Sequence, residues 1–406
     1  MTIFAFISEN SPVRLWSLNS AERLQRQLRE ISKESYGDSN VIHWLNNIDD
    51  APSSSQVLLL NGSFLFETRT LKGVLERLNS ILQHTDHTPA AAFIDAGRLQ
   101  EVLAYMTNPD QRLPEDLQVV QTWDMEAFDE SLRRAITPML EPVNTEHKNE
   151  LENSLYGNAY KGITDLVTKF VWPKPAKLVV HLCATMRISP NMVTTLGLLL
   201  VVAACYLFLN GFYGWGLVAG WIMTFLDTVD GKLARVTIQS SKFGHLFDHV
   251  IDLFHPPFWY IFWGMSLLNF QTVLGQGLLQ MYWIIVLAYV AGRVVEGIFP
   301  LLGNCSIFTW RPIDAWFRLV TARRNPCMIL LTISLLIGKP EWGFVAVTFW
   351  SAFSSVILIL RLTQAFIIRL KRGPLDSWLS ESNVANGPNA YSYSIFGTTR
   401  GAYARQ

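Results

Sequence analysis

Apolar residues recur differently in the two halves of the chain. In residues 1–150, short apolar runs alternate with amphipathic stretches, whereas residues 191–370 consist largely of long apolar runs. Short apolar runs that alternate with amphipathic stretches indicate strands that alternate with helices. Apolar runs long enough to cross a bilayer indicate membrane helices. We therefore predict a multidomain protein, with an N-terminal α/β domain built on a parallel sheet and a C-terminal all-α polytopic membrane domain.

The N-terminal pattern assigns individual elements. Strands are expected at residues 3–7, 56–60, 91–94 and 117–120. Helices are expected at residues 19–32, 67–80, 97–106 and 125–136. Because strands and helices alternate along the chain, a parallel sheet is the predicted arrangement.

The C-terminal pattern predicts six transmembrane helices, at roughly 192–209, 212–229, 247–268, 278–299, 325–338 and 343–367. Basic residues gather between the second and third, between the fourth and fifth, and after the sixth, whereas the connections near 210, 269–277 and 339–342 hold only Lys339. The positive-inside rule then places the basic loops and both termini in the cytoplasm. We expect an integral protein of the inner (plasma) membrane with a cytoplasmic active site.

Composition narrows the function further. Charged residues make up 16% of the chain and the formal net charge is zero, so no nucleic-acid partner is indicated.

Residues 173–190, ahead of the first predicted span, have the pattern of an interfacial amphipathic helix, which would contact membrane lipids; an ordinary linker helix is the alternative.

Four aspartates lie where the second and third predicted spans meet: Asp227, Asp230, Asp248 and Asp252. On helices, the first two are spaced i, i+3 and the last two i, i+4, so each pair shares one face. Ionisable groups at membrane depth are costly and are usually retained for function. A pair of hard divalent cations, Mg²⁺ or Mn²⁺, would relieve the repulsion among four carboxylates.

This stretch resembles the signature of the CDP-alcohol phosphotransferase family, D-x2-D-G-x2-A-R-x8-G-x3-D-x3-D, at every specified position. The resemblance implies that Asp227, Asp230 and Asp248 bind the metals. It implies that Asp252 is a metal neighbour and the general base. The residues implied in binding the CDP group are Asp227, Gly231, Ala234, Arg235, Gly244, Pro190 and Thr194.

The small residues of the signature have a physical reason, because glycine and alanine allow a nucleotide to approach a helix closely. Pro190 and Thr194 belong to a Pro-Asn-x-x-Thr turn that is similar to the turn before the first span in that family. A helix start capped by Ser189 or Asn191 explains the same residues locally.

The reaction that the resemblance implies displaces CMP from a CDP-alcohol donor by an acceptor hydroxyl and leaves a phosphodiester. The acceptor would be an alcohol or a polyol phosphate, in phospholipid or inositol-phosphate-type lipid biosynthesis. The resemblance also implies a homodimer. An acceptor phosphate would suit the forked donors of arginine, and the candidates are Arg293, Arg311, Arg323, Arg324 and Arg361. Positive-inside topology and headgroup contact are the alternative explanation for these arginines.

The N-terminal region is faintly similar to a sugar-phosphate nucleotidyltransferase, in Ser20–Leu28 and Leu58–Phe66. It departs from that pattern, because Ser8–Trp16 holds no glycine to cradle a triphosphate, and Asn61 stands where a metal-binding aspartate is expected. We expect an inactive domain with a regulatory, dimer-forming or scaffolding role. The predicted divisions are the cytosolic domain at 1–140, a connector at 141–190, the membrane domain at 191–372 and a polar tail at 373–406.

Two other functions compete with the transferase. A divalent-cation transporter would use the four aspartates as its ion site. That hypothesis gives no reason for Gly231, Ala234, Arg235 and Gly244 in fixed spacing. A catalytically silent membrane scaffold is the third possibility, and the intact signature argues against it.

Overall fold

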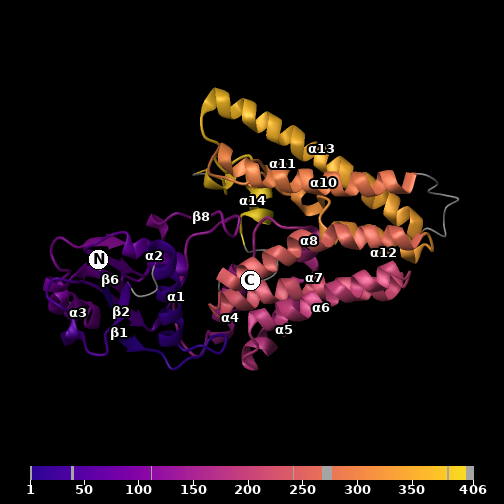
Figure 1. The fold of residues 1–406 in the computed structure, drawn as a ribbon. Coiled ribbons are helices and arrows are strands. Elements are labelled where there is room, and N and C mark those ends of the chain that lie inside the picture. The colour runs from indigo at the N-terminus through magenta and orange to yellow at the C-terminus, as the bar shows by residue number, and fades with distance from the viewer. Residues whose placement is uncertain are drawn as a thin grey trace. The chain divides into compact units, whose positions relative to one another are not determined.

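The protein is described by a computed structural model that covers residues 2–37, 41–110, 112–240, 242–267, 277–381 and 384–398 (Figure 1). Most of the connection predicted at 269–277, and parts of the predicted tail at 373–406, lie outside these described residues. The chain divides into two compact units. The first comprises residues 1–128, 136–158 and 235–240, and the second comprises residues 129–135, 159–234 and 241–406.

The first unit is built on a six-stranded sheet with the strand order β2-β1-β3-β6-β5-β7. Its strands are β1 (Ile3–Asn10), β2 (Ile42–Trp44), β3 (Gln56–Gly62), β5 (Ser80–Gln83), β6 (Pro89–Asp95) and β7 (Gln118–Val120). A short separate pair joins β4 (Phe64–Phe66) to β10 (Leu140–Pro142).

The prediction of a parallel sheet is wrong, because the sheet is mixed. β1 pairs in parallel with β2 and β3, and β5 with β7, but β6 is antiparallel to both β3 and β5. The reason lies in the turn between β5 and β6, where the backbone of His84 bonds to Thr88 and Asp86 accepts from the Thr88 amide. A turn this short can only return the chain antiparallel, since a parallel pair needs a long crossover.

Alternation along the strands explains the two layers of helix around the sheet. Leu58, Leu60 and Phe93 pack with α1 (Ser20–Ser35) and α2 (Thr68–Leu75), whereas Leu59 and Ala92 pack with α3 (Leu99–Thr107). Successive side chains of a strand point to opposite faces, so both faces here are apolar and covered. Figure 1 shows α3 on the opposite side of the sheet from α1 and α2.

All four predicted strands are present, and three of the four predicted helices. The helix predicted at 125–136 is wrong, since this segment forms turns and two short strands, β8 (Phe128–Asp129) and β9 (Arg134–Ala135). There the Asp129 carboxylate accepts from Ser131 Oγ and from the amide of Leu132, at 2.6 and 3.1 Å. Such local side-chain bonds compete with a helix and stabilise a turn instead.

The second unit is helical. Its helices are α5 (Pro173–Thr185), α6 (Pro190–Leu209), α7 (Tyr213–Val236), α8 (Lys242–Ser266), α10 (Leu278–Ile298), α11 (Pro312–Val320), α12 (Arg324–Leu336), α13 (Pro340–Arg372) and α14 (Ala390–Phe396). Six of them, α6, α7, α8, α10, α12 and α13, share one apolar core around Trp259 and Trp263 of α8. Both indole groups donate to main-chain carbonyls, of Val201 at 3.2 Å and Pro340 at 3.0 Å, which satisfies them inside the core.

Three helices are long and apolar enough to cross a membrane: α6, the segment Leu278–Leu302 that contains α10, and α13. A fourth candidate is α11 with α12, which together are bent by 42°. Large apolar side chains on these helices are exposed, among them Leu199, Leu287 and Leu360, as expected of a surface that faces lipid. The protein is therefore a membrane protein with three or four candidate spans among its described residues. Helices also occupy the other predicted positions, but α7 and α8 are not among those candidates.

Buried hydrogen bonds join the helix α4 (Lys148–Asn158) of the first unit to Trp16, and a substitution there measures how much they stabilise the unit. The buried Glu152 accepts from the Trp16 amide at 2.9 Å, and its carbonyl accepts from the Trp16 indole at 3.1 Å. Glu152→Ala would leave the buried Trp16 amide without its acceptor, so we expect a loss of about 2 kcal/mol in stability. Thermal unfolding of the full chain in detergent measures this loss. Glu150→Ala, on the exposed side of the same helix, is the control, and equal effects of the two changes would contradict the role of Glu152.

Candidate active site

Two helices carry the signature aspartates. Asp227 and Asp230 lie in the second half of α7, and Asp248 and Asp252 in the first half of α8. Gly220 allows α7 to pack closely, since a Cβ there would lie 2.6 Å from Met328 Cε of α12 and 3.3 Å from the Trp259 ring of α8. Close packing of these helices holds the acidic faces in place.

Asp227, Asp230 and Asp248 form one compact group. Each offers a carboxylate oxygen, and these oxygens all lie within 4.8 Å of one another. Asp230 is nearly buried, with 5% of its surface exposed. Carboxylates this close repel each other strongly where water is scarce. An all-oxygen set of this kind fits a hard divalent cation such as Mg²⁺ or Mn²⁺.

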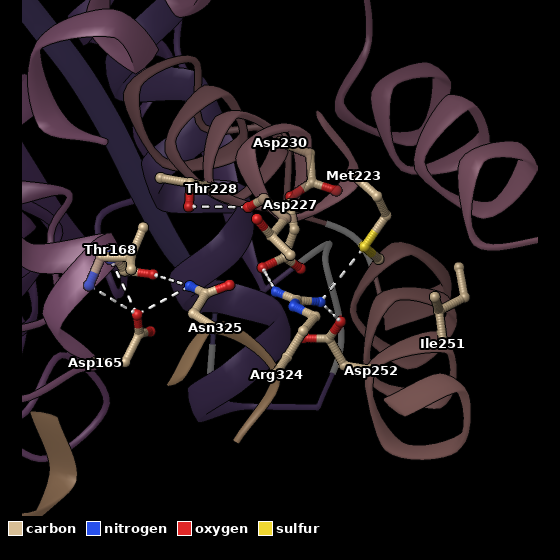
Figure 2. Close-up of polar contacts among 12 residues, drawn as sticks. Asp165, Thr168, Met223, Asp227, Thr228, Asp230, Ile251, Asp252, Arg324 and Asn325 are labelled. Atoms are coloured by element: carbon tan, nitrogen blue, oxygen red, sulfur yellow. Dashed lines mark hydrogen bonds and ion pairs between the residues drawn. The ribbon is translucent and has the colours of Figure 1, made fainter. Parts of the chain in front are cut away.

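Asp252 does not belong to that group of three. Arg324 links Asp252 to Asp227, which is a member of the group. Arg324 Nη1 donates to Asp252 Oδ1 at 2.5 Å, and Arg324 Nη2 donates to Asp227 Oδ2 at 2.5 Å. Figure 2 shows the guanidinium between the two carboxylates. Arg324 is the first residue of α12, so its backbone lies at the N-terminal, positive end of that helix. The sequence placed Arg324 among the acceptor ligands, and the structure brings it to the aspartates.

The hydroxyl of Thr194, the fifth residue of α6, donates to Asp230 Oδ2 at 2.6 Å. Both groups are buried, so this bond orients the carboxylate within the group of three. The sequence predicted that Thr194 contacts the nucleotide. The structure gives it a second task, which is to position a metal-binding candidate.

A second anchor holds the start of α12. Asn325 Nδ2 donates to Asp165 Oδ1 at 2.9 Å and to Thr168 Oγ1 at 3.2 Å (Figure 2). Asp165 also accepts from the amides of Val167 and Thr168. Burial alone would raise the pKa of Asp165, but Arg318 and these hydrogen bonds outweigh it, so the pKa lies below its usual value. Asp165 therefore stays ionised and fixes the residue next to Arg324.

Sequence analysis missed Asp165 and Asn325. Asp165 lies outside the predicted membrane domain, and 160 residues separate it from Asn325. Asn325 follows two arginines and precedes Pro326, which indicates only the start of a helix. Neither residue carries a motif that points to the other.

The residues predicted to bind the nucleotide follow the aspartates along the helices. Gly231 and Ala234 are partly buried on α7, Gly244 is partly buried on α8, and Arg235 is exposed. Pro190 is buried at the first position of α6. Contact of these residues with a nucleotide stays a prediction.

The five arginines predicted for the acceptor have different partners. Arg293 bonds to Glu296 at 2.6 Å, and Arg323 bonds to the same carboxylate. Arg361 forms a forked pair with Asp314, at 2.6 and 2.7 Å. Arg311 and Arg361 both lie over the ring of Trp310, and Arg324 is held by the aspartates. The arginines thus fall into three groups, of which Arg293 and Arg323 share one counter-ion.

Comparison with known proteins agrees with this site. Residues 187–371 match the CDP-alcohol phosphatidyltransferase family. The archaetidylinositol phosphate synthase of Pyrococcus horikoshii is 37% identical over 82 residues, which cover 20% of this chain and 42% of that protein. The aligned segment thus spans less than half the length of this curated relative. All four signature aspartates lie inside the matched family region, and Asp165 lies outside it.

Thr194→Val tests whether Thr194 positions Asp230. Loss of its hydrogen bond should weaken Mn²⁺ binding about 10-fold, the usual effect of removing a group that orients a metal ligand. Thr195→Val is the matched control, because the Thr195 hydroxyl is exposed and, within the described part of the chain, donates to the carbonyl of Asn191 instead of to an aspartate. Isothermal titration of the purified protein with Mn²⁺ measures both affinities. Equal affinities of the two variants would show that Thr194 does not support the site.

Proposed function

Because residues 187–371 match the CDP-alcohol phosphatidyltransferase family, we propose that the protein displaces CMP from a CDP-alcohol with an acceptor hydroxyl. The observation that carries the proposal is the convergence of the Asp227, Asp230 and Asp248 carboxylates within 4.8 Å. Such a group, at the meeting point of two helices, suits two divalent ions beside a pyrophosphate. Gly231, Ala234 and Gly244, on the same two helices, leave room for the nucleotide.

The residues divide the chemistry between them. The acceptor oxygen attacks the phosphorus that carries the alcohol, the bond from that phosphorus to the bridging oxygen breaks, and CMP leaves with the bonding electrons. Asp252 takes the proton of the acceptor hydroxyl. Its side chain is 37% exposed, more than those of Asp227 and Arg324, so an acceptor can reach it. When bound, Mg²⁺ or Mn²⁺ held by the aspartates would neutralise phosphate charge.

The acceptor that we favour is a polyol phosphate. The named activity of the Pyrococcus horikoshii relative concerns an inositol phosphate lipid, and that relative matches this chain over 82 residues. Arg293 and Arg323, which share Glu296, offer forked donors for the phosphate of such an acceptor. A diacylglycerol-linked donor would then give an inositol-phosphate-type lipid.

We further propose the topology and assembly that the enzyme needs. The six helices α6, α7, α8, α10, α12 and α13 would be the six spans, with α7 and α8 tolerating their charges because these face a shared site. The basic loops place the active site and both termini in the cytoplasm. The first unit would serve a regulatory, dimer-forming or scaffolding role, and the enzyme would be a homodimer.

The test is CMP release by the purified protein in detergent with Mg²⁺ or Mn²⁺. The donors are CDP-diacylglycerol and other CDP-alcohols, each offered with serine, glycerol phosphate, inositol phosphate or diacylglycerol. We expect metal-dependent release with one pair, lowered at least 100-fold in Asp248→Asn and in Asp252→Asn. Asp252→Asn should still bind the CDP donor, because it changes proton transfer and leaves the group of three intact.

Two results would contradict this proposal. Turnover that survives in Asp252→Asn would remove Asp252 as the base. No release and no binding of any CDP donor, together with metal uptake by vesicles that contain the protein, would favour the alternative of a divalent-cation transporter.

A further inference from the structure

We propose that Arg324 is an internal cation that holds Asp227 and Asp252 together while metal is absent, and that it competes with the second divalent ion for these carboxylates. The inference rests on the metal site of the proposed function. It concerns how Arg324 interacts with the carboxylates of that site before the ions bind.

One guanidinium, that of Arg324, bonds to side chains of two helices. Its two terminal nitrogens reach Asp227 of α7 and Asp252 of α8, each at 2.5 Å. Only 13% of the Arg324 side chain is exposed. A forked pair of charge-assisted bonds in a poorly hydrated place is strong. It joins the two halves of the acidic site in the way that a bridging metal ion would.

The charges show why a cation is needed there. The carboxylates of Asp227, Asp230 and Asp248 converge from α7 and α8, and Arg324 bonds directly to Asp227 and to the neighbouring Asp252. A single positive charge compensates part of the repulsion, and it leaves Asp230 and Asp248 for another cation. The first ion can therefore bind to the group of three without displacing the arginine completely.

A second ion that binds Asp227 and Asp252 meets the positive charge of the arginine, which already occupies one oxygen of each carboxylate. A divalent ion binds carboxylate oxygen at about 2.1 Å. An oxygen that already accepts from a guanidinium at 2.5 Å would then bring two positive groups into contact. This repulsion makes the second ion and Arg324 compete for Asp227 and Asp252.

The backbone of Arg324 is fixed by its neighbour, whereas its side chain is held only through its terminal nitrogens among the described residues. Asn325, the next residue, is tied to Asp165 and Thr168, so the first turn of α12 is fixed. Within the described part of the chain, Arg324 Nε is buried without a hydrogen-bond partner. The two terminal nitrogens are held by Asp227 and Asp252, with a weaker bond from Nη1 to Met223 Sδ at 3.7 Å, and a divalent cation can replace the guanidinium at the carboxylates.

The experiment is a titration of the full-length protein in detergent with Mn²⁺ alone, following free Mn²⁺ by electron paramagnetic resonance. We compare the unchanged protein with Arg324→Gln, Arg361→Gln and Asp248→Asn. Arg361→Gln is the matched control, since it removes an arginine of the same helical unit that pairs with Asp314. We expect Arg324→Gln to bind the second Mn²⁺ at least 10-fold more tightly than the unchanged protein, with Arg361→Gln unchanged.

The outcomes separate this inference from the function on which it rests. Mn²⁺ binding that is lost in Asp248→Asn but is equal or weaker in Arg324→Gln would overturn the inference alone, and would make Arg324 a permanent structural link. No Mn²⁺ binding in any variant would overturn the metal site as well.

A second measurement follows the unfolding temperature and adds a variant that keeps the positive charge. Arg324→Lys keeps the charge, but a single ammonium group lacks the fork that bridges two carboxylates. The unfolding temperature of each protein is recorded after chelation and again after Mn²⁺ is added. Because a tighter ligand stabilises more, the rise on adding Mn²⁺ should be largest in Arg324→Gln and intermediate in Arg324→Lys. Equal rises in all three proteins would contradict competition.

Discussion

The rest of the structure depends on the mutual repulsion of carboxylates that two helices bring together. α7 packs against α8 and α12 at Gly220, and the carboxylates of Asp227, Asp230 and Asp248 lie within 4.8 Å of one another. Positive charge inside such an arrangement stabilises it, because it offsets the repulsion between the carboxylates. The chain supplies one such charge from α12, and the composition of the site leaves places for hard divalent ions.

Support for this site comes from residues outside the family region as well as from inside it. Thr194 at the start of α6 orients Asp230, and Asp165, before that region, fixes Asn325 beside Arg324. The segment that leads into the membrane helices is therefore part of the machinery that positions the site. A shell of this kind determines how accurately the carboxylates are placed.

The chemistry of the site could be predicted from the sequence because its residues are close along the chain. The aspartates fall at i, i+3 and i, i+4 on two successive helices, and helix geometry alone turns each pair to one side. The contacts of Arg324 could not be predicted in this way. They join it to residues 72 and 97 positions earlier, and they depend on where α12 begins relative to α7 and α8.

The errors in the first unit have a similar cause. Alternating strands and helices suggested a parallel sheet, but the short turn after Gln83 reverses the chain and makes β6 antiparallel to its neighbours. At residues 125–136, apolar residues recur at helical spacing, but the local hydrogen bonds of Asp129 stabilise a turn instead of a helix. In both places, hydrogen bonds within a turn of a few residues determined the local structure, and the longer pattern of apolar residues predicted a different one.

The most direct test of the central claim is to locate Mn²⁺ by its anomalous X-ray scattering in crystals of the full chain grown with the metal. The account predicts a peak bounded by Asp227, Asp230 and Asp248, and a second peak beside Asp252 with the Arg324 guanidinium moved away from it. Crystals that show no peak among these carboxylates, with Arg324 still bridging Asp227 and Asp252, would contradict it.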